Sequence, residues 1–239
     1  MVIPCIDMKI ILIGAGNLAT RLAVALQKKG MTPAYIYSRT RESAEQLSER
    51  LRDVPYSTDI SRVPTDGDLY IFAVKDSALL DLVSRMPANR GLWVHTAGSM
   101  DMEVFAPYTA RYGVFYPMQT FSKERKTDFD DIPIFVEANH TNDTERLQEL
   151  AGRLSTKVYE ATSEQRKYLH LAAVFACNFT NHLYALCDRI LSEHGLPFET
   201  MLPLIRETAA KVADMPPAQA QTGPAIRYDK NVIDKQMAL

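Results

Sequence analysis

The stretch that most constrains the fold is a run of apolar, mostly β-branched residues that enters a glycine turn and leaves it as an amphipathic helix. The run is 9–13, and it continues as Gly14-Ala15-Gly16-Asn17-Leu18-Ala19. A buried parallel strand followed by a helix with free N–H groups is typical of a phosphate site. Gly14 permits the tight turn, Gly16 lets a pyrophosphate approach the backbone, and Ala19 allows close packing of helix on strand. We therefore predict a dinucleotide site that includes Gly14, Gly16, Asn17 and Leu18.

The residues after the second expected strand, 34–37, bear on the choice of cofactor. They are Ser38-Arg39-Thr40-Arg41, where an NAD site usually carries an acidic residue that holds the ribose 2′-hydroxyl. A hydroxyl and a guanidinium instead suit the 2′-phosphate of NADP. The alternative interpretation is a solvated helix start, because Thr40 is a good N-cap. We favour NADP, bound by Ser38 and Arg39, with NAD as the second choice.

Strands and helices alternate from residue 9 to residue 160. Further strands are expected at 68–74, 92–96, 112–115, 132–137 and 157–159. This alternation predicts an α/β fold with a doubly wound, mostly parallel Rossmann sheet covered on both faces. The carboxyl ends of such strands lie beside the cofactor, so we expect Val74, Lys75 and Thr96 to contact ribose or nicotinamide. An exposed loop lysine is the alternative for Lys75, and a core histidine is the simplest interpretation of His95.

The character of the chain changes at Thr162, which forms a capping box with Gln165. No stop signal follows before Gly195, so we expect a helix of about 32 residues, about 48 Å long. Its apolar residues cover more than half of the circumference, whereas a surface helix needs a stripe of only about 100°. We therefore expect the helix to be buried between two subunits of a homodimer. The predicted domains are an NAD(P)-binding Rossmann domain, 1–161, and a helical substrate and dimerisation domain, 162–239.

A narrow polar arc runs along this helix. It contains Lys167, His170, Asn178, Asn181 and His182. Polar groups on a buried helix carry a desolvation cost unless they are paired. We interpret the arc as the wall of a cleft, and satisfied interface polar groups are the alternative.

Composition narrows the class of protein. A net charge of -2 gives no reason to expect nucleic acid or an anionic membrane as a partner. No apolar run approaches the ~20 residues of a membrane span, and residues 1–7 do not resemble a signal peptide, so we expect a cytoplasmic protein. Cys5, Cys177 and Cys187 have no metal-ligand spacing, so we expect no metal and buried free thiols.

Four motifs together resemble those of a bacterial family of Rossmann-like NADP oxidoreductases of unknown substrate. They are His95-Thr96-Ala97-Gly98-Ser99; Tyr116-Pro117-Met118-Gln119-Thr120-Phe121; Tyr168 to Phe175 with Asn178; and Thr222-Gly223-Pro224-Ala225 with Arg227 and Asp229. More distantly, the layout is similar to pyrroline-5-carboxylate reductase, ketopantoate reductase and the β-hydroxyacid dehydrogenases. The resemblance implies a dinucleotide domain followed by a dimerising helical domain like that of 6-phosphogluconate dehydrogenase. It also implies an active site between the two domains.

The chain departs from the β-hydroxyacid dehydrogenases, which carry Lys-x-x-x-Asn on the long helix. Here Val174 lies four residues before Asn178. His170 is then the nearest group that transfers a proton at neutral pH, with Lys167 as the longer-reach alternative. In this scheme Asn178 orients the substrate.

The remaining expected substrate contacts are Ser99, Gln119 and Arg227, of which Arg227 suits a carboxylate. The expected function is NADP-dependent hydride transfer between nicotinamide and a C=O or C=N group of a small metabolite. The missing helix lysine motivates the alternative, a catalytically silent dinucleotide-binding sensor or regulatory dimer. A deazaflavin partner alongside NADP is a further alternative.

Overall fold

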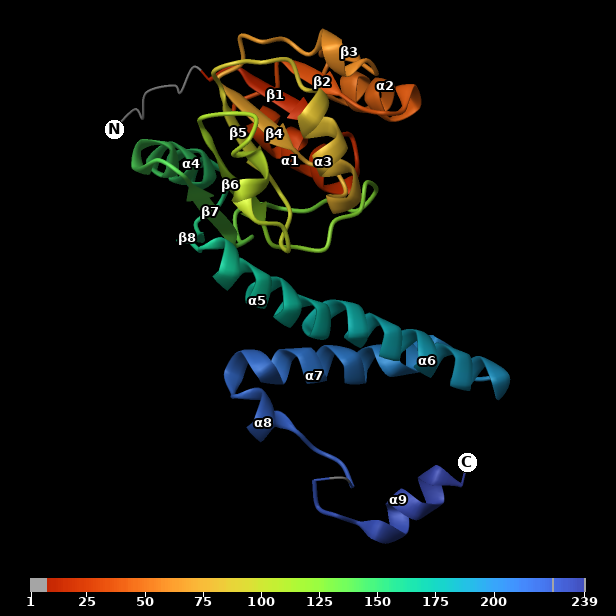
Figure 1. The fold of residues 1–239 in the computed structure, drawn as a ribbon. Helices are drawn as coiled ribbons and strands as arrows, with labels where there is room; N and C mark the ends of the chain where they lie inside the picture. The colour runs from red at the N-terminus through yellow and green to blue at the C-terminus, as the bar shows by residue number, and fades with distance from the viewer. Residues whose placement is uncertain (1–7, 225, 239) are drawn as a thin grey trace. The chain divides into compact units, whose positions relative to one another are not determined.

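The computed structural model describes residues 8–224 and 226–238. The chain divides into two compact units, unit 1 (Met1–Cys177) and unit 2 (Asn178–Leu239) (Figure 1). The predicted domain boundary after residue 161 rests on a change of sequence pattern and stays a prediction. The expectations for Cys5 and the N-terminal residues fall on residues 1–7, and these, like Ala225 of the fourth motif, lie outside the described part.

One sheet forms the centre of unit 1, with the strand order β3-β2-β1-β4-β5-β6-β7-β8. Neighbouring strands are parallel except for β6 and β7, which are antiparallel. This confirms the predicted mostly parallel, doubly wound α/β fold. The strands are β1 (Ile10–Ile13), β2 (Tyr35–Tyr37), β3 (Tyr56–Ser57), β4 (Leu69–Phe72), β5 (Leu92–His95), β6 (Tyr112–Pro117), β7 (Ile134–Ala138) and β8 (Val158–Glu160).

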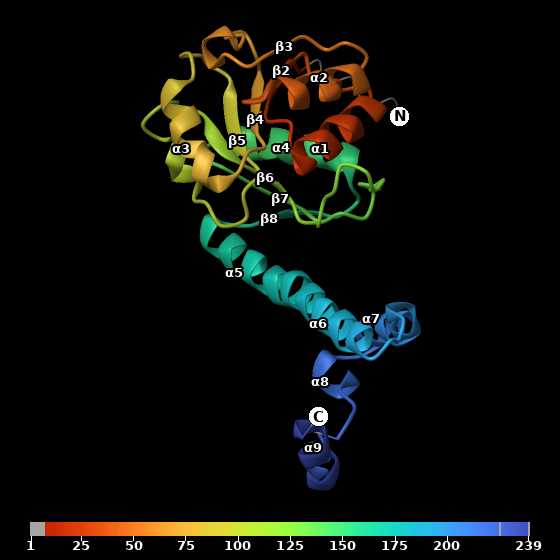
Figure 2. The same ribbon diagram turned by 90° about the vertical axis from the view of Figure 1, so that its right-hand side faces the viewer.

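Helices cover both faces of this sheet (Figure 2). α1 (Asn17–Lys28), α2 (Arg41–Arg50) and α4 (Thr141–Leu154) contribute to a core with Ile10 and Leu12 of β1. On the other face, α3 (Asp76–Arg85) contributes to a core with Ile11 and Ile13. Because β1 is buried on both faces, its sequence is continuously apolar instead of alternating.

The long helix begins where it was predicted. Thr162 Oγ1 accepts a hydrogen bond from the N–H of Gln165 at 3.2 Å, and Gln165 Oε1 accepts one from the N–H of Thr162 at 2.9 Å. The helix runs as α5 (Ser163–Ala173), a π-helical segment (Val174–Phe179) and α6 (Thr180–Glu193). The sequence pattern did not predict the π-helical segment, a feature that is frequent at functional sites.

Unit 2 contains the end of that helix, a 3-10 helix (Phe198–Met201) and three further α-helices among its described residues. These are α7 (Leu202–Asp214), α8 (Pro217–Ala220) and α9 (Lys230–Met237). Pro203 lies in the first turn of α7, where its missing N–H removes no helical bond. Pro216 and Pro217 follow the end of α7.

The expected burial of the long helix between two subunits stays a prediction, because the structure contains one chain. None of the described residues of the π-helical segment or of α6 is buried. The expectation of buried thiols is wrong for the single chain, where Cys177 is exposed and Cys187 half-exposed. The broad apolar face is present, and large side chains on it, such as Leu171 and Leu183, are exposed in the single chain. Among the described residues, none of the helices has both the length and the apolar character that a membrane span requires.

Candidate functional site

The turn after β1 is built around Gly14. Its φ is +123°, and a Cβ atom there would lie 2.3 Å from the carbonyl oxygen of Ala73. The Gly14 N–H donates to the carbonyl oxygen of Tyr37 at 2.7 Å. The turn is therefore fixed between the ends of β2 and β4, and no side chain fits at Gly14.

Gly16 differs from Gly14 because the neighbouring described atoms would leave room for a side chain at this position. It has an ordinary φ of -77°, and a Cβ atom built on it would meet no atom of the described residues within 4 Å. The small residue thus leaves open space at the first turn of α1. Open space beside a glycine is what close approach of a ligand to the backbone needs.

The N-terminus of α1 is suited to an anion. Gly16 provides no side-chain cap, and the first turn contains no acidic residue. The first N–H groups of a helix, here those of Asn17 and Leu18, have no acceptor within the helix, and the helix dipole adds positive potential. The turn lies at the β1–β4 boundary, where the strand order reverses and where doubly wound sheets bind their ligands.

The side chain of Asn17 is directed to another segment. Its Nδ2 donates to the carbonyl oxygen of Phe121 at 3.1 Å, and one turn later Arg21 Nε donates to the carbonyl oxygen of Ser122 at 2.8 Å. The side chain of Asn17 is thus engaged, and a phosphate contact through its backbone N–H stays a prediction. The same contacts tie the segment that follows Gln119 to the start of α1.

Ser38 and Arg39 follow β2 at the same edge of the sheet. Ser38 is buried, and its N–H donates to the carbonyl oxygen of Ser57 at 3.2 Å. Arg39 is exposed. The pair stays the predicted 2′-phosphate site.

Val74, Lys75 and Thr96 lie at the carboxyl ends of β4 and β5. A Cβ atom on Gly14 would lie 3.2 Å from Val74 Cγ1, which places Val74 beside the glycine turn. Lys75 is exposed and caps α3. Thr96 is buried, and its hydroxyl donates to the carbonyl oxygen of Phe72 at 3.4 Å. The sheet thus brings these residues to the edge that carries Gly14, and their contact with a cofactor stays a prediction.

His95 is a core residue with two backbone partners. Its Nδ1 accepts from the N–H of Ala97 at 3.2 Å, and its Nε2 lies 3.3 Å from the carbonyl oxygen of Asp101. Burial, reinforced by the positive charge of Arg166, lowers the pKa of His95 to about 4. The ring is therefore neutral at physiological pH, with its proton on Nε2.

His170 of α5 reaches the turn that follows β5. A Cβ atom on Gly98 would lie 2.5 Å from His170 Nδ1, so only glycine admits the ring at this position. The hydroxyl of Tyr116 lies 3.2 Å from the same nitrogen. The alternative acid, Lys167, is exposed and pairs with Asp101 at 3.5 Å. His170 is thus the better placed of the two beside the carboxyl end of β5.

Sequence reasoning missed Arg166, whose side chain is fully buried one turn before His170. Its Nη1 donates to Glu137 Oε2 at 2.9 Å, and Nε donates to the carbonyl oxygen of Ala97 at 3.2 Å. A third bond reaches the carbonyl oxygen of Met100. Residues four apart share one face of a helix, so Arg166 also sets the position of His170 against this turn. The sequence contains one signal for Arg166, namely that this cation lies on the same helix face as His170.

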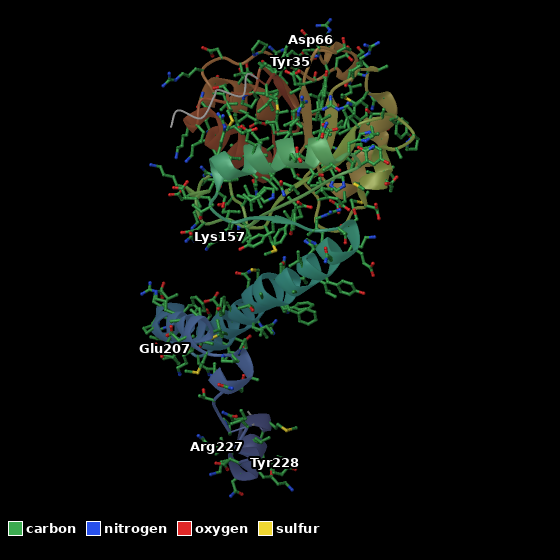
Figure 3. All side chains as sticks on the ribbon, turned by 90° about the vertical axis from the view of Figure 1, so that its left-hand side faces the viewer. Tyr35, Asp66, Lys157, Glu207, Arg227 and Tyr228 are labelled. Carbon is green, nitrogen blue, oxygen red and sulfur yellow. The ribbon has the colours of Figure 1, made fainter. Side chains whose placement is uncertain are left out.

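The predicted substrate residues are distributed between the two units. Ser99 is exposed and donates to Asp76, and Gln119 is exposed with its Oε1 accepting from the N–H of Thr120 at 2.8 Å. Asn178 and Arg227 belong to unit 2, where Arg227 is exposed in the segment before α9 (Figure 3). The roles of these four residues stay predictions.

Comparisons with known proteins agree with this architecture. A family model described as a Rossmann-like domain matches residues 3–118, and one described as a domain of unknown function (DUF2520) matches residues 132–239. Among curated protein sequences, no match was found.

Several solved structures are similar. A Bacteroides fragilis protein named as a putative NADP oxidoreductase is 52% identical, with a TM-score of 0.89 over 97% of this chain and 90% of that one. A Thermotoga maritima protein is 23% identical, with a TM-score of 0.80 over 95% of this chain and 88% of that one.

More distant structures share the fold alone. A reductive aminase from Aspergillus terreus, in complex with NADPH and ethyl-5-oxohexanoate, is 18% identical, with a TM-score of 0.67 over 87% of this chain and 74% of that one. A pyrroline-5-carboxylate reductase from Coxiella burnetii is 17% identical, with a TM-score of 0.64 over 94% of this chain and 84% of that one.

The resemblance first seen in four sequence motifs is thereby confirmed. With 52% identity over 97% of its residues, the chain belongs to the same Rossmann-like family as the Bacteroides fragilis protein.

Proposed function

We propose that the protein is an NADP-dependent oxidoreductase that transfers a hydride between the nicotinamide and the carbon of a C=O or C=N group in a small metabolite. The observation that carries this proposal is the open space at Gly16 beside the uncapped first turn of α1. The family supports it as well, because the Bacteroides fragilis relative is named as a putative NADP oxidoreductase.

The residues present fit NADP. The N–H groups of Asn17 and Leu18, with the backbone of Gly14 and Gly16, would hold the pyrophosphate. Ser38 and Arg39 would bind the 2′-phosphate, and residues 38–41, directly after β2, contain no carboxylate that would repel it.

The nicotinamide would lie at the ends of β4 and β5, beside Val74, Lys75 and Thr96. When bound, NADPH supplies the hydride, and the protein holds the reacting carbon close to it and excludes water.

His170 would hold or donate the proton at the oxygen or nitrogen of the substrate. Its position beside Gly98 supports this role, because Gly98 follows directly on the strand end that would contact the nicotinamide. Asn178 would orient the substrate, and Ser99 and Gln119 would bind its polar groups. Arg227 would bind a substrate carboxylate.

We further propose that two copies associate through the long helix. Its exposed large apolar residues are Tyr168, Leu171, Phe175, Phe179, Leu183 and Ile190. Apolar surface of this extent is uncommon on a chain that works alone. The cytoplasmic location and the absence of a nucleic-acid partner stay predictions from the sequence.

Calorimetry with NADPH and NADH, followed by assays over a panel of keto acids and cyclic imines, tests the proposal. We expect tight NADPH binding, weaker NADH binding and oxidation of NADPH by at least one member of the panel. His170→Ala should lower kcat by about 10²–10⁴-fold, the contribution of a general acid, and leave the Kd of NADPH unchanged. A loss below about tenfold would exclude His170 as the acid.

The same experiment distinguishes the alternative function. Val174 occupies the place of the dehydrogenase lysine, which favours a sensor that binds the dinucleotide without turnover. Tight NADPH binding without oxidation by any member of the panel would support the sensor. Failure to bind either nicotinamide cofactor would remove both functions.

A further inference from the structure

Tyr116 and His170 form a pair from two elements that are far apart in the sequence. Tyr116 lies near the end of β6 and is 7% exposed, and its ring packs 6.4 Å from that of Phe135. The His170 ring stands edge-on to it, with the centroids 6.3 Å apart. Gly98 closes the other side of the imidazole. His170 Nδ1 therefore faces the Tyr116 hydroxyl at 3.2 Å and has little freedom to turn away.

The hydroxyl of Tyr116 is the donor in this pair. Burial raises its pKa, so the hydroxyl keeps its proton at neutral pH. Within residues 8–224 and 226–238, His170 Nδ1 is its one hydrogen-bond partner. If Nδ1 carried the proton instead, the buried hydroxyl hydrogen would lack an acceptor, at a cost of about 1–3 kcal/mol. Donation from Tyr116 to an unprotonated Nδ1 avoids that cost.

We infer that Tyr116 is a positioning residue that holds neutral His170 in the tautomer with its proton on Nε2, so that the ring presents an N–H donor to the substrate. A donor polarises a C=O or C=N group through the lone pair of its oxygen or nitrogen. Transfer of the proton itself requires a second proton on the ring, because a neutral imidazole that gave up its Nε2 proton would become an imidazolate. The role toward the substrate rests on the proposed function, while the tautomer itself does not.

Nuclear magnetic resonance of the full-length protein with ¹⁵N-labelled histidine tests the tautomer without cofactor or substrate. The spectrum is recorded at alkaline pH, and the ¹⁵N shifts of the two ring nitrogens report which of them carries the proton. His170→Asn identifies the His170 signals among those of the five histidines. We expect an unprotonated Nδ1 and a protonated Nε2.

Tyr116→Phe keeps the ring and removes the donor. Since one hydrogen bond contributes about 1 kcal/mol, the ratio of the Nε2–H to the Nδ1–H tautomer should fall about five- to tenfold. Tyr112→Phe is the matched control, because Tyr112 lies on the same strand and donates to Glu103. Unchanged signals of the buried His95 verify that each variant is folded. A wild-type proton on Nδ1, or an unchanged ratio in Tyr116→Phe, would overturn the inference.

A kinetic measurement separates this inference from the proposed function. Tyr116→Phe should lower kcat for reduction about five- to tenfold with the Kd of NADPH unchanged. The expected tautomer in a protein without turnover would refute the proposed function and leave the tautomer assignment intact. Full turnover by Tyr116→Phe would refute the role of Tyr116 while leaving the proposed function intact.

Discussion

The substitution Gly16→Asp tests the predicted phosphate site without disturbing the fold. Gly16 is the N-cap of α1, and its Cβ position is open. Because Asp is at least as good an N-cap as Gly, the free energy of unfolding should change by only a few tenths of a kcal/mol. A carboxylate about 4 Å from a pyrophosphate oxygen repels it by about 4 kcal/mol at an effective dielectric constant of about 20. Each 1.4 kcal/mol is about tenfold in affinity, so the Kd of NADPH should rise about a thousandfold.

Calorimetric titration with NADPH and urea unfolding of the same preparations measure the two quantities. His140→Asp is the matched control, since His140 is the N-cap of α4 and also makes no side-chain cap bond. We expect both variants to fold and only Gly16→Asp to lose NADPH. A folded Gly16→Asp variant whose Kd stays within about tenfold of the wild-type value would refute the reasoning.

Three further predictions follow from the cofactor site and the core. Arg39→Ala should weaken NADPH binding about ten- to hundredfold, because a hydrogen bond to a charged group contributes about 1.5–3 kcal/mol. Calorimetry should show that the affinity for NADH is unchanged. An equal loss of affinity for both cofactors would contradict the prediction. Arg166→Met removes the cation paired with Glu137, which keeps only its hydrogen bonds from Ser163, and should lower the free energy of unfolding in urea by about 3–5 kcal/mol. A loss under about 1 kcal/mol would count against the assignment. Burial lowers the pKa of His95 to about 4, below the unfolded value of about 6.5, so the unfolded chain binds the extra proton in this interval. The contribution of His95 to the free energy of unfolding is complete above about pH 6.5 and is lost as the pH falls to about 4. Between pH 7 and about 4.5, the free energy of unfolding of the wild type should therefore fall by about 2 kcal/mol more than that of His95→Gln. Equal losses in the two proteins would exclude this cause.

The core of the fold could be predicted because its signals are local. β1, β4 and β5 are short, continuous apolar runs bounded by turn residues, and this pattern indicates strands that are buried on both faces. β3 was missed because Tyr56–Ser57 is too short to show a period. The antiparallel direction of β7 was missed because strand direction depends on the connection and not on the strand residues.

The candidate site was predicted only in part. The roles of Gly14 and Gly16 are local properties of one turn, so the spacing of the two residues is informative. The Tyr116–His170 pair joins residues 54 positions apart, and no local pattern indicates such a contact. The apolar breadth of the long helix was evident, but an amphipathic pattern does not identify the surface that covers it.

The central claim is that the turn around Gly14 and Gly16, with Ser38 and Arg39, holds NADP. A crystal structure with NADPH tests it most directly. We predict the pyrophosphate against the N–H groups of Asn17 and Leu18, and the 2′-phosphate at Ser38 and Arg39. NADPH bound elsewhere, with the first turn of α1 left without a phosphate, would contradict the claim.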